Sequence, residues 1–425
     1  MTTRLFRSLF ESLLEGTDVQ LGGCEPWDIV VNRDRLYRRA LRGSLGIGEA
    51  YIDGDWDCLA LDELFRRVLL AHKLNSPLIR AARALKVLQS RLTNLQTRRR
   101  SRAVAEEHYD LDHRMYALFL GPWNQYTCCF FDGTDDLGQA EAIKLEMLCD
   151  KLELRPGDRL LDIGCGWGGF ARYAAATRGC EITGISLSTE QIRYAQEYTQ
   201  GLPVTIAKLD YRDLPRSGLP PFDKISIVGM LEHVGYRNYG TLMQVVREML
   251  KPDGLFLLHT IGNTERSTVV DPWVEKYIFR NSMAPSMDQL ASATEGCFVV
   301  EDWENYGHYY VPTLQAWYER FNANWERIRA LNTTRAFDER FRRMWNYYLM
   351  SSKAAFEVEQ LHLWQLVMTR RGSGRGVYSR VRQRPGSRAA FPATPGQSGI
   401  RSAISPATRE QPDRSAENFQ QPREM

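Results

Sequence analysis

The chain has 425 residues, of which 43% are hydrophobic and 25% are charged, and its formal net charge is +3. This composition excludes a disordered or fibrous protein, and the length allows two or three domains with a sizeable core. No apolar run reaches the roughly 20 residues that span a bilayer, and the N-terminus MTTRLFRSLFESLLEG lacks the apolar block and cleavage site of a signal peptide. We therefore expect a cytoplasmic protein. The eight cysteines form no CxxC pair and no cluster with histidines, so we expect reduced thiols and no metal site.

Residues 1–105 predict a helical N-terminal domain with short turns. The stretch GSLGIGEAYIDGDWD at 43–57 predicts a turn region, because its glycines and aspartates interrupt any longer helical period. Residues 66–102 contain eleven Lys or Arg residues and no Asp or Glu. Within this basic segment, residues 78–92 place leucines on one helical face and basic side chains on the other.

Three interpretations of the basic segment are open. The simplest is a helix packed on the core with a solvated basic face. Nucleic acid is disfavoured, because the chain carries no recognised nucleic-acid module. An anionic membrane surface suits the segment better, since each basic side chain near such a surface contributes about 1 kcal/mol. We expect a peripheral protein on the inner face of the membrane and no nucleic-acid partner.

From about residue 106 strand-like runs alternate with helical runs. The predicted strands cover 159–164, 181–186, 204–210, 224–230 and 255–262, and the predicted helices between them cover 170–179, 189–200 and 239–250. This alternation predicts an α/β fold with a doubly wound parallel sheet, covered on both faces, whose ligand crevice lies at the carboxyl ends of the strands. Long aromatic-rich helices are expected at 313–331 and 337–368. We assign 106–384 to a catalytic domain and the Pro-, Ser- and Arg-rich residues 385–425 to a disordered tail.

Four glycines follow the first predicted strand of this domain, in LDIGCGWGGF at 161–170. A glycine-rich turn between a strand and a helix lets a ligand approach the backbone amides at the helix N-terminus. A dinucleotide site would need GxGxxG and an acid at the end of the second strand. Here the spacing is GxGxGG, and the second strand ends in Gly184-Ile185-Ser186 without an acid. The form D-x-G-x-G-x-G is instead typical of S-adenosylmethionine-dependent methyltransferases.

Further motifs make the resemblance specific. PWDIVVN, GSLGIGEAYIDGDW, EHYDL, QYTCCF, LDIGCGWGG, YRDL, VGMLEHVG, LLHTIG, DPWVEKYIF and LQAWYERF occur in this order over most of the chain. With these motifs the chain resembles the cyclopropane fatty acid synthase family, whose members are S-adenosylmethionine-dependent methyltransferases. The resemblance implies a doubly wound, Rossmann-like methyltransferase domain with a smaller helical lipid-binding domain before it. Two departures from the family pattern are Tyr309, where an acid is common, and Lys353, where small residues are usual.

The resemblance also implies the residues that bind S-adenosylmethionine. Gly164, Gly166 and Gly168 form the cofactor loop, with Asp162 at the start of the motif. Ser186 and Gln191 are implied to hold the ribose, although ordinary helix capping is an alternative for both. The remaining residues are Asp210, Tyr211 and Arg212, which lie beside the adenine in the family, and Tyr126 and Thr127, which cover the methionine end.

Methyl transfer to an alkene generates a carbocation, and ring closure then removes a proton from the transferred methyl group. The resemblance implies bound bicarbonate as the base, held by Cys128, Glu232, His259, Ile261 and Tyr310, with Ile261 acting through its backbone. Glu232 and His259 are expected at the crevice because they follow the fourth and fifth predicted strands. The structural alternatives are a buried core thiol at Cys128, a satisfied core histidine at His259 and a helix cap at Glu232. A covalent role for Cys128 is disfavoured, since no histidine is its neighbour in sequence.

The function that we expect is transfer of a methylene from S-adenosylmethionine to the cis double bond of an unsaturated phospholipid acyl chain. The first alternative is a relative that gives a branched or methylene product, or that uses a non-phospholipid acceptor. The second is a lipid-binding protein that has lost catalysis. The expected partner is unsaturated phospholipid at an anionic membrane surface, and the family leads us to expect a homodimer.

Overall fold

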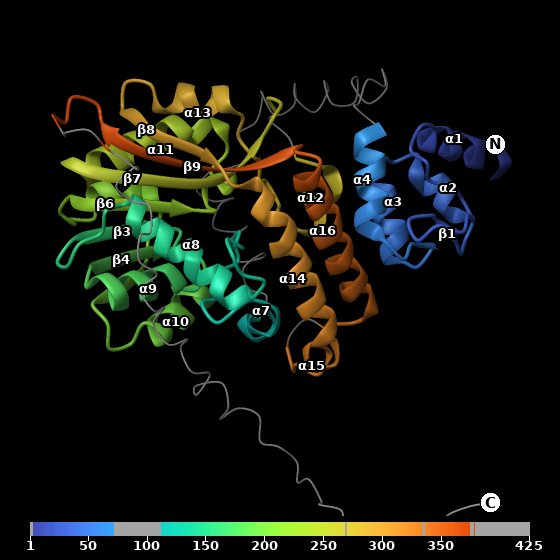
Figure 1. Cartoon of the computed structure of the whole chain (residues 1–425), viewed down its shortest axis with the longest axis horizontal. Coiled ribbons are helices and arrows are strands. Elements are labelled where there is room, and N and C mark those ends of the chain that lie inside the picture. Colours follow the sequence, from blue (N-terminus) through green and yellow to red (C-terminus); the bar gives the residue numbers. More distant parts are fainter. Residues whose placement is uncertain (1–2, 72–111, 268–269, 334–335, 375–377, 379–425) are drawn as a thin grey trace, which may run out of the picture.

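The computed structural model describes residues 3–71, 112–267, 270–333, 336–374 and 378. A seven-stranded sheet occupies one end of the molecule, and the N-terminal helices occupy the other (Figure 1). Two long helices, α14 (Tyr310–Ala323) and α16 (Glu339–Glu357), stand between these parts. The helix expected at 78–92, the domain boundary at 105 and the tail from 385 lie outside the described residues.

Five strands of the sheet are parallel, as the sequence predicts. They are β3 (Arg159–Ile163), β4 (Glu181–Ser186), β5 (Val204–Lys208), β6 (Phe222–Val228) and β7 (Leu250–Asn263). Their order in the sheet is β5-β4-β3-β6-β7, with β3 in the middle and the direction of winding reversed on its two sides. This confirms the doubly wound α/β class. The ligand crevice of such a sheet lies where β3 and its neighbours end.

The prediction of a helix up to residue 368 is wrong. Helix α16 ends at Glu357, Glu359 adopts a left-handed φ of 57°, and residues Leu361–Arg370 form strand β9. Strand β9 lies antiparallel between β7 and β8 (Phe298–Asn305), a strand that we did not expect. Residues 363–369 are buried without interruption because strands cover both edges of β9 and apolar side chains cover both of its faces. A short apolar run of this kind looks the same in a buried helix and in a central strand.

Helices cover both faces of the sheet. Helices α8 (Leu137–Lys151) and α9 (Gly169–Arg178) pack on the face that presents Leu160 and Leu257. Helices α11 (Tyr236–Met249) and α13 (Met287–Thr294) pack on the face that presents Leu161 and Leu258. The alternation of side chains along each strand therefore supplies two separate cores. Helix α10 (Thr189–Tyr198) packs beside β4 and β5, and the long helix expected at 313–331 is divided at Asn324 into α14 and α15 (Trp325–Arg329).

The N-terminal part consists of α1 (Thr3–Leu14), α2 (Arg35–Ala40), α3 (Ser44–Ile52) and α4 (Leu61–Ala71), with a short antiparallel pair of β1 (Val30–Val31) and β2 (Trp56–Asp57). The prediction of a turn region at 43–57 is wrong, because α3 occupies most of it. Gly46 and Gly48 inside this helix serve close packing, whereas Gly43 and Gly54 at its two ends have left-handed φ angles and form turns. A Cβ atom on Gly48 would lie 2.3 Å from Trp273 Cδ1 in α12 (Pro272–Tyr277), so only glycine lets these helices approach.

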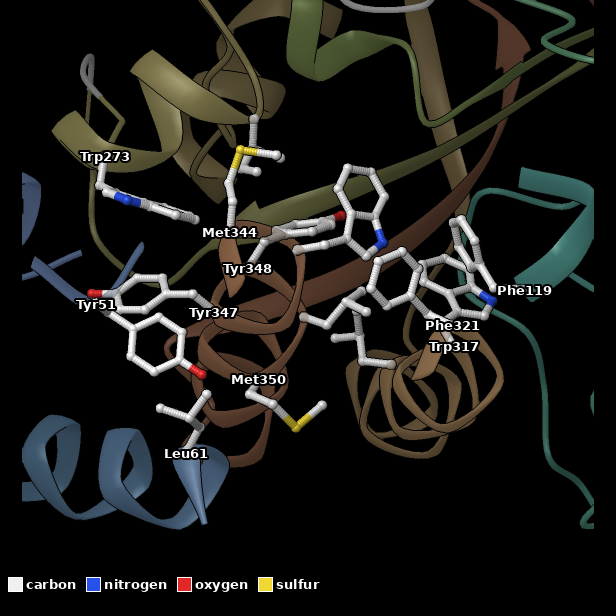
Figure 2. Packing of buried hydrophobic residues seen from close by; sticks show 14 of the residues in the cluster. Tyr51, Leu61, Phe119, Trp273, Trp317, Phe321, Met344, Tyr347, Tyr348 and Met350 are labelled. Carbon is white, nitrogen blue, oxygen red and sulfur yellow. The ribbon is translucent and has the colours of Figure 1, made fainter. Parts of the chain in front are cut away.

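One apolar cluster joins the N-terminal helices to the helices beside the sheet. Figure 2 shows Tyr51 of α3 and Leu61 of α4 packed toward Tyr347 and Met350 of α16. The ring centroids of Tyr51 and Tyr347 are 5.6 Å apart, and those of Trp273 and Tyr347 are 4.4 Å apart. The two parts therefore share a core across α16. Within the described ranges, no helix combines the length and apolar character needed to cross a membrane.

Candidate active site

A pocket opens at the carboxyl ends of β3, β4 and β6, beside the glycine-rich turn. Gly164 and Gly166 line it, with left-handed φ angles of 84° and 53°. A Cβ atom added to Gly166 would meet no atom within 4 Å, which places the open side of the turn toward the pocket. Gly168 does not line the pocket; it is left-handed at φ 80° and caps the start of α9. The turn thus exposes backbone at the N-terminus of a helix, which is a suitable surface for a polar ligand.

The end of β4 contributes two polar side chains to the same pocket. Ser186 donates a hydrogen bond from Oγ to Gln191 Oε1 over 3.0 Å, and both residues line the pocket. The helix-cap alternative is wrong for Ser186, since Ser188 is the N-cap of α10 and accepts from the Gln191 backbone N–H over 3.2 Å. Gln191 is instead held with its side chain toward Ser186. The pair offers hydroxyl and amide groups where a dinucleotide site would have an acid.

Residues 210–212 form the neighbouring wall. Asp210 is buried, and its carboxylate accepts from Arg212 Nε over 2.8 Å and ion-pairs with the same guanidinium at 2.7 Å. Tyr211 and Arg212 line the pocket, whereas Asp210 does not. Asp210 therefore lies behind the wall and orients Arg212.

Asp162 lies at the base of the pocket, in β3. Its Oδ1 accepts from Ser226 Oγ of β6 over 2.8 Å, and burial raises the pKa of the carboxyl to about 6. Opposite, Tyr126 and Thr127 line the pocket from the loop that precedes α8. The structure thus brings all the expected cofactor residues except Gly168 and Asp210 to one pocket.

Several lining residues were not predicted from the sequence. Trp167, His233, Arg280 and Asn281 line the same pocket. Trp167 and His233 lie inside motifs that we quoted, LDIGCGWGG and VGMLEHVG, but their roles follow only from the fold. Arg280 and Asn281 follow directly after the motif DPWVEKYIF. Burial lowers the pKa of His233 to about 4, so this ring is neutral at physiological pH.

Glu232 is the first of the expected catalytic residues. It lies in the 3-10 turn η2 (Leu231–His233) after β6, and its Oε1 accepts from the backbone N–H of Ile261 over 2.7 Å. Oε2 is buried and has no partner among the described residues. Burial raises the pKa of the carboxyl to about 7. The helix-cap alternative is wrong, because α11 begins at Tyr236 with Gly235 at its N-cap.

His259 lies within β7 rather than after it, which corrects the expected position. Its ring is buried, and Nδ1 forms a hydrogen bond of 3.1 Å with Gln365 Nε2 of the central strand β9. Nε2 is buried without a partner in the described part of the chain, so the alternative of a fully satisfied core histidine fails. Burial holds the pKa of the ring well below its ordinary value. Gln365 was missed by the sequence analysis, since it lies in the run expected to be helical.

Cys128 and Tyr310 complete the buried group. The Cys128 thiol is fully buried, donates to the Cys129 carbonyl over 3.5 Å, and lies 3.9 Å from Thr313 Oγ1 of α14. Burial raises the pKa of this thiol, which disfavours a thiolate nucleophile. Tyr310 stacks on Phe356 of α16 at 4.2 Å. Burial, with smaller effects from Cys128 and Glu232, holds the pKa of its phenol well above the ordinary value.

The unpartnered atoms Glu232 Oε2 and His259 Nε2 are the main electrostatic feature of this group. A buried polar atom without a partner costs free energy, and it marks a place where a small polar molecule fits. None of the five expected catalytic residues lines the cofactor pocket, although Thr127 and His233, their neighbours in sequence, do. Cys128 and Glu232 are therefore next in sequence to residues of the pocket wall.

Solved structures share this fold. Mycolic acid cyclopropane synthase CmaA1, in a crystal structure complexed with SAH and CTAB, superposes with a TM-score of 0.56 at 25% identity, over 63% of this chain and 97% of that one. The doubly wound sheet and its glycine-rich turn define the class: the protein is an S-adenosylmethionine-dependent methyltransferase.

Sequence comparisons give the family. A family model described as mycolic acid cyclopropane synthetase matches residues 96–366. Cyclopropane-fatty-acyl-phospholipid synthase of Escherichia coli (strain K12) is 45% identical over 84% of this chain and 92% of that protein. A probable fatty acid methyltransferase of Mycobacterium tuberculosis, Rv3720, is 30% identical over 81% of this chain and 86% of its own length. The chain belongs to the cyclopropane synthase family, as the motifs predicted.

Proposed function

We propose that the protein closes a cyclopropane ring on the cis double bond of an unsaturated phospholipid acyl chain. The observation that carries the proposal is the buried carboxylate of Glu232, which accepts from the Ile261 backbone N–H and has no partner at Oε2 in the described part of the chain. It is next in sequence to His233, which lines a pocket suited to a nucleoside ligand. The name of the relative at 45% identity, a cyclopropane-fatty-acyl-phospholipid synthase, supports the substrate class.

S-adenosylmethionine supplies an electrophilic methyl group when it is bound. The residues that fit it are Gly164, Gly166, Ser186, Gln191, Tyr211 and Arg212, with Tyr126 and Thr127 at the end nearest the buried group. The left-handed turn leaves space for close contact with the backbone, and Ser186 and Gln191 offer hydrogen bonds to hydroxyl groups. Gly168 and Asp210 act indirectly, by starting α9 and by holding Arg212.

Bicarbonate suits the buried group as the proton acceptor. Glu232 Oε2 and His259 Nε2 are two of the buried polar atoms that lack a partner in the described part of the chain, and such atoms can accept from and donate to a small oxyanion. Ile261 aligns the Glu232 carboxylate through its N–H, and Gln365 fixes the His259 ring. The apolar surroundings exclude water, which protects a developing cation.

The N-terminal part is proposed to contact the membrane. Leu5, Leu9 and Leu13 are spaced four residues apart on α1 and remain 43%, 42% and 39% exposed. An exposed apolar stripe on an amphipathic helix suits the interface of a lipid bilayer. A homodimer and a place on the inner face of the membrane remain part of this proposal.

The deciding experiment supplies S-adenosylmethionine and vesicles of cis-unsaturated phospholipid to the purified protein. Acyl chains are then released and analysed by gas chromatography and mass spectrometry against cyclopropane and methylene-branched standards. We expect a product heavier by one CH2 that co-elutes with the cyclopropane standard. Co-elution with the branched standard would replace ring closure by simple methylation, the chemistry suggested by the name of Rv3720.

The variant Glu232→Gln tests whether Glu232 takes part in ring formation. Sedimentation with anionic vesicles tests whether the protein binds a membrane. Glu232→Gln keeps the shape of the side chain and is expected to abolish ring formation while SAH still binds. Loss of SAH binding in this variant would show that Glu232 belongs to the cofactor site. Failure of the wild type to sediment with anionic vesicles would exclude the membrane contact.

A further inference from the structure

Two charged side chains of α8 are fully buried one helical turn apart. Glu141 and Lys144 are both 0% exposed. Burying a charge is costly unless hydrogen bonds compensate it, so each of these residues needs a reason for its position. Neither residue belongs to the cofactor pocket or to the buried group of Glu232 and His259.

Glu141 holds the main chain of the loop before α8. Its carboxylate accepts three backbone N–H groups, from Gly121 over 3.0 Å, Trp123 over 2.8 Å and Gln125 over 3.1 Å. Three hydrogen bonds to one carboxylate fix the path of residues 121–125 relative to the helix.

Lys144 holds the side chains of the same loop. Its Nζ donates to Thr127 Oγ1 over 2.7 Å and to Gln125 Oε1. Both partners are neutral oxygens, and both residues line the cofactor pocket, together with Asn124 before them and Tyr126 between them. The ammonium therefore lies immediately behind one wall of the pocket.

The lysine also faces the buried catalytic group. Its charge interacts with Cys128, Cys129 and Asp162, and it helps to keep the pKa of His259 low. Lys144 thus contacts the wall of the pocket that we assign to the methyl donor and acts electrostatically on Cys128 and His259.

We propose that Lys144 is a positioning residue, whose ammonium sets Gln125 and Thr127 in the arrangement of the pocket wall that binds the methyl donor. Glu141 supports it by fixing the main chain of the loop. This inference rests on the proposed function, because it takes the pocket as the S-adenosylmethionine site. Burial lowers the pKa of Lys144 to about 8, so the ammonium is present at neutral pH and is lost at pH 9.

The test compares two lysines of α8. Lys151 lies seven residues after Lys144, is 1% exposed, and pairs with Glu304 at 2.7 Å, away from the pocket lining. Calorimetry at pH 7 measures the affinity of Lys144→Met and Lys151→Met for SAH, and thermal unfolding measures their stability. We expect Lys144→Met to bind SAH about tenfold more weakly and Lys151→Met to stay within about twofold of wild type. Equal affinities for the two folded variants would overturn the proposal.

Lys144→Arg provides a second test that can be used if Lys144→Met does not fold. Wild-type affinity for SAH is expected to fall between pH 7 and pH 9, whereas Lys144→Arg keeps its charge and is expected to show no such fall. The same fall in both proteins would overturn the proposal. If wild type binds no SAH at all, the proposed function fails first; if wild type binds SAH and Lys144→Met binds it equally, only the role of Lys144 fails.

Discussion

Glu232 carries an ordinary carboxyl group in an environment that opposes its charge. Its Oε1 has one backbone donor, its Oε2 has no partner in the described part of the chain, and burial raises its pKa to about 7. At neutral pH the carboxyl is therefore near its midpoint, and small changes nearby alter its charge. A group of this kind suits proton chemistry better than structural pairing.

This environment makes stability depend on pH in a predictable direction. Because the folded pKa of Glu232 lies above the ordinary value of 4.5, the group favours folding most below pH 4.5, and this contribution is lost as pH rises through about 7. Glu232→Gln cannot ionise, so its free energy of unfolding should gain about 3 kcal/mol relative to wild type between pH 4.5 and pH 8. Urea unfolding of both proteins across this range measures the difference.

Asp62 provides a control, because its pKa is shifted in the opposite direction to that of Glu232. Burial raises the pKa of its carboxyl, but the hydrogen bond and charge of Lys353 outweigh burial and lower it overall. Asp62→Asn should therefore lose stability relative to wild type as pH rises toward the ordinary value of 3.8, and the difference should stay constant above about pH 5. A flat difference for Glu232→Gln between pH 4.5 and pH 8 would show that Glu232 is ionised without penalty.

At the scale of elements, the contact of α3 with α12 depends on glycine. Gly48 and Gly240 both lie inside helices, but a Cβ atom on Gly48 would meet the Trp273 ring at 2.3 Å, whereas a Cβ atom on Gly240 would meet nothing within 4 Å. Alanine favours a helix over glycine by about 0.5–1 kcal/mol where space allows. The space around each glycine therefore decides whether alanine stabilises or destabilises the folded protein at that position.

We expect opposite results from the same substitution at these glycines. Gly48→Ala should lower the free energy of unfolding by about 1–3 kcal/mol, because it forces the helices apart. Gly240→Ala should raise it by up to about 1 kcal/mol. Chemical denaturation measures both, and a stabilising Gly48→Ala would contradict the close packing of α3 on Trp273.

The elements show which parts of the fold can be predicted from sequence. Covering helices follow β3, β4 and β6 in the chain, so the local pattern identifies the strands from β3 to β7. The partners of β9 lie far away in the chain: it pairs with β7 and β8, and its apolar run carries no local sign of this. Helix α3 was missed for the same reason, since the role of Gly48 depends on Trp273, more than two hundred positions later.

The residues of the candidate site also include some that could be predicted from sequence and some that could not. The glycine-rich turn and the motif residues were predictable because their spacing is local and the family pattern is specific. Lys144, Glu141 and Gln365 were missed because a polar residue on a helix or strand looks like an exposed one until the fold buries it. Their importance follows only from contacts with loops and strands that are distant in sequence.

At the scale of the whole molecule, Arg343 joins the catalytic helices to the N-terminal part. Its guanidinium donates to the backbone carbonyls of Tyr51 over 2.6 Å and Trp56 over 2.9 Å, and it pairs with Asp57 at 2.7 Å. It also lies 4.0 Å from the centroid of the Tyr51 ring. With the shared core of Figure 2, this contact fixes the N-terminal helices against α16.

Arg343→Met should loosen the N-terminal part. We expect faster hydrogen exchange in residues 44–57 and a loss of about 2–3 kcal/mol in stability, because two backbone carbonyls lose a charged donor. Arg342→Met is the matched control, since the adjacent side chain bonds to Asn322 within the catalytic part. Equal exchange in both variants would mean that the apolar core alone holds the two parts together.

The position of β9 has a consequence for how the protein is made. Residues 361–370 are made after β7 and β8, yet they form the strand that lies between them and supply the Gln365 amide that fixes His259. A nascent chain that ends at residue 360 contains all the residues that line the pocket, but not the strand that pairs with the edge of β7. All the residues of the pocket lining are therefore made before the strand that fixes His259.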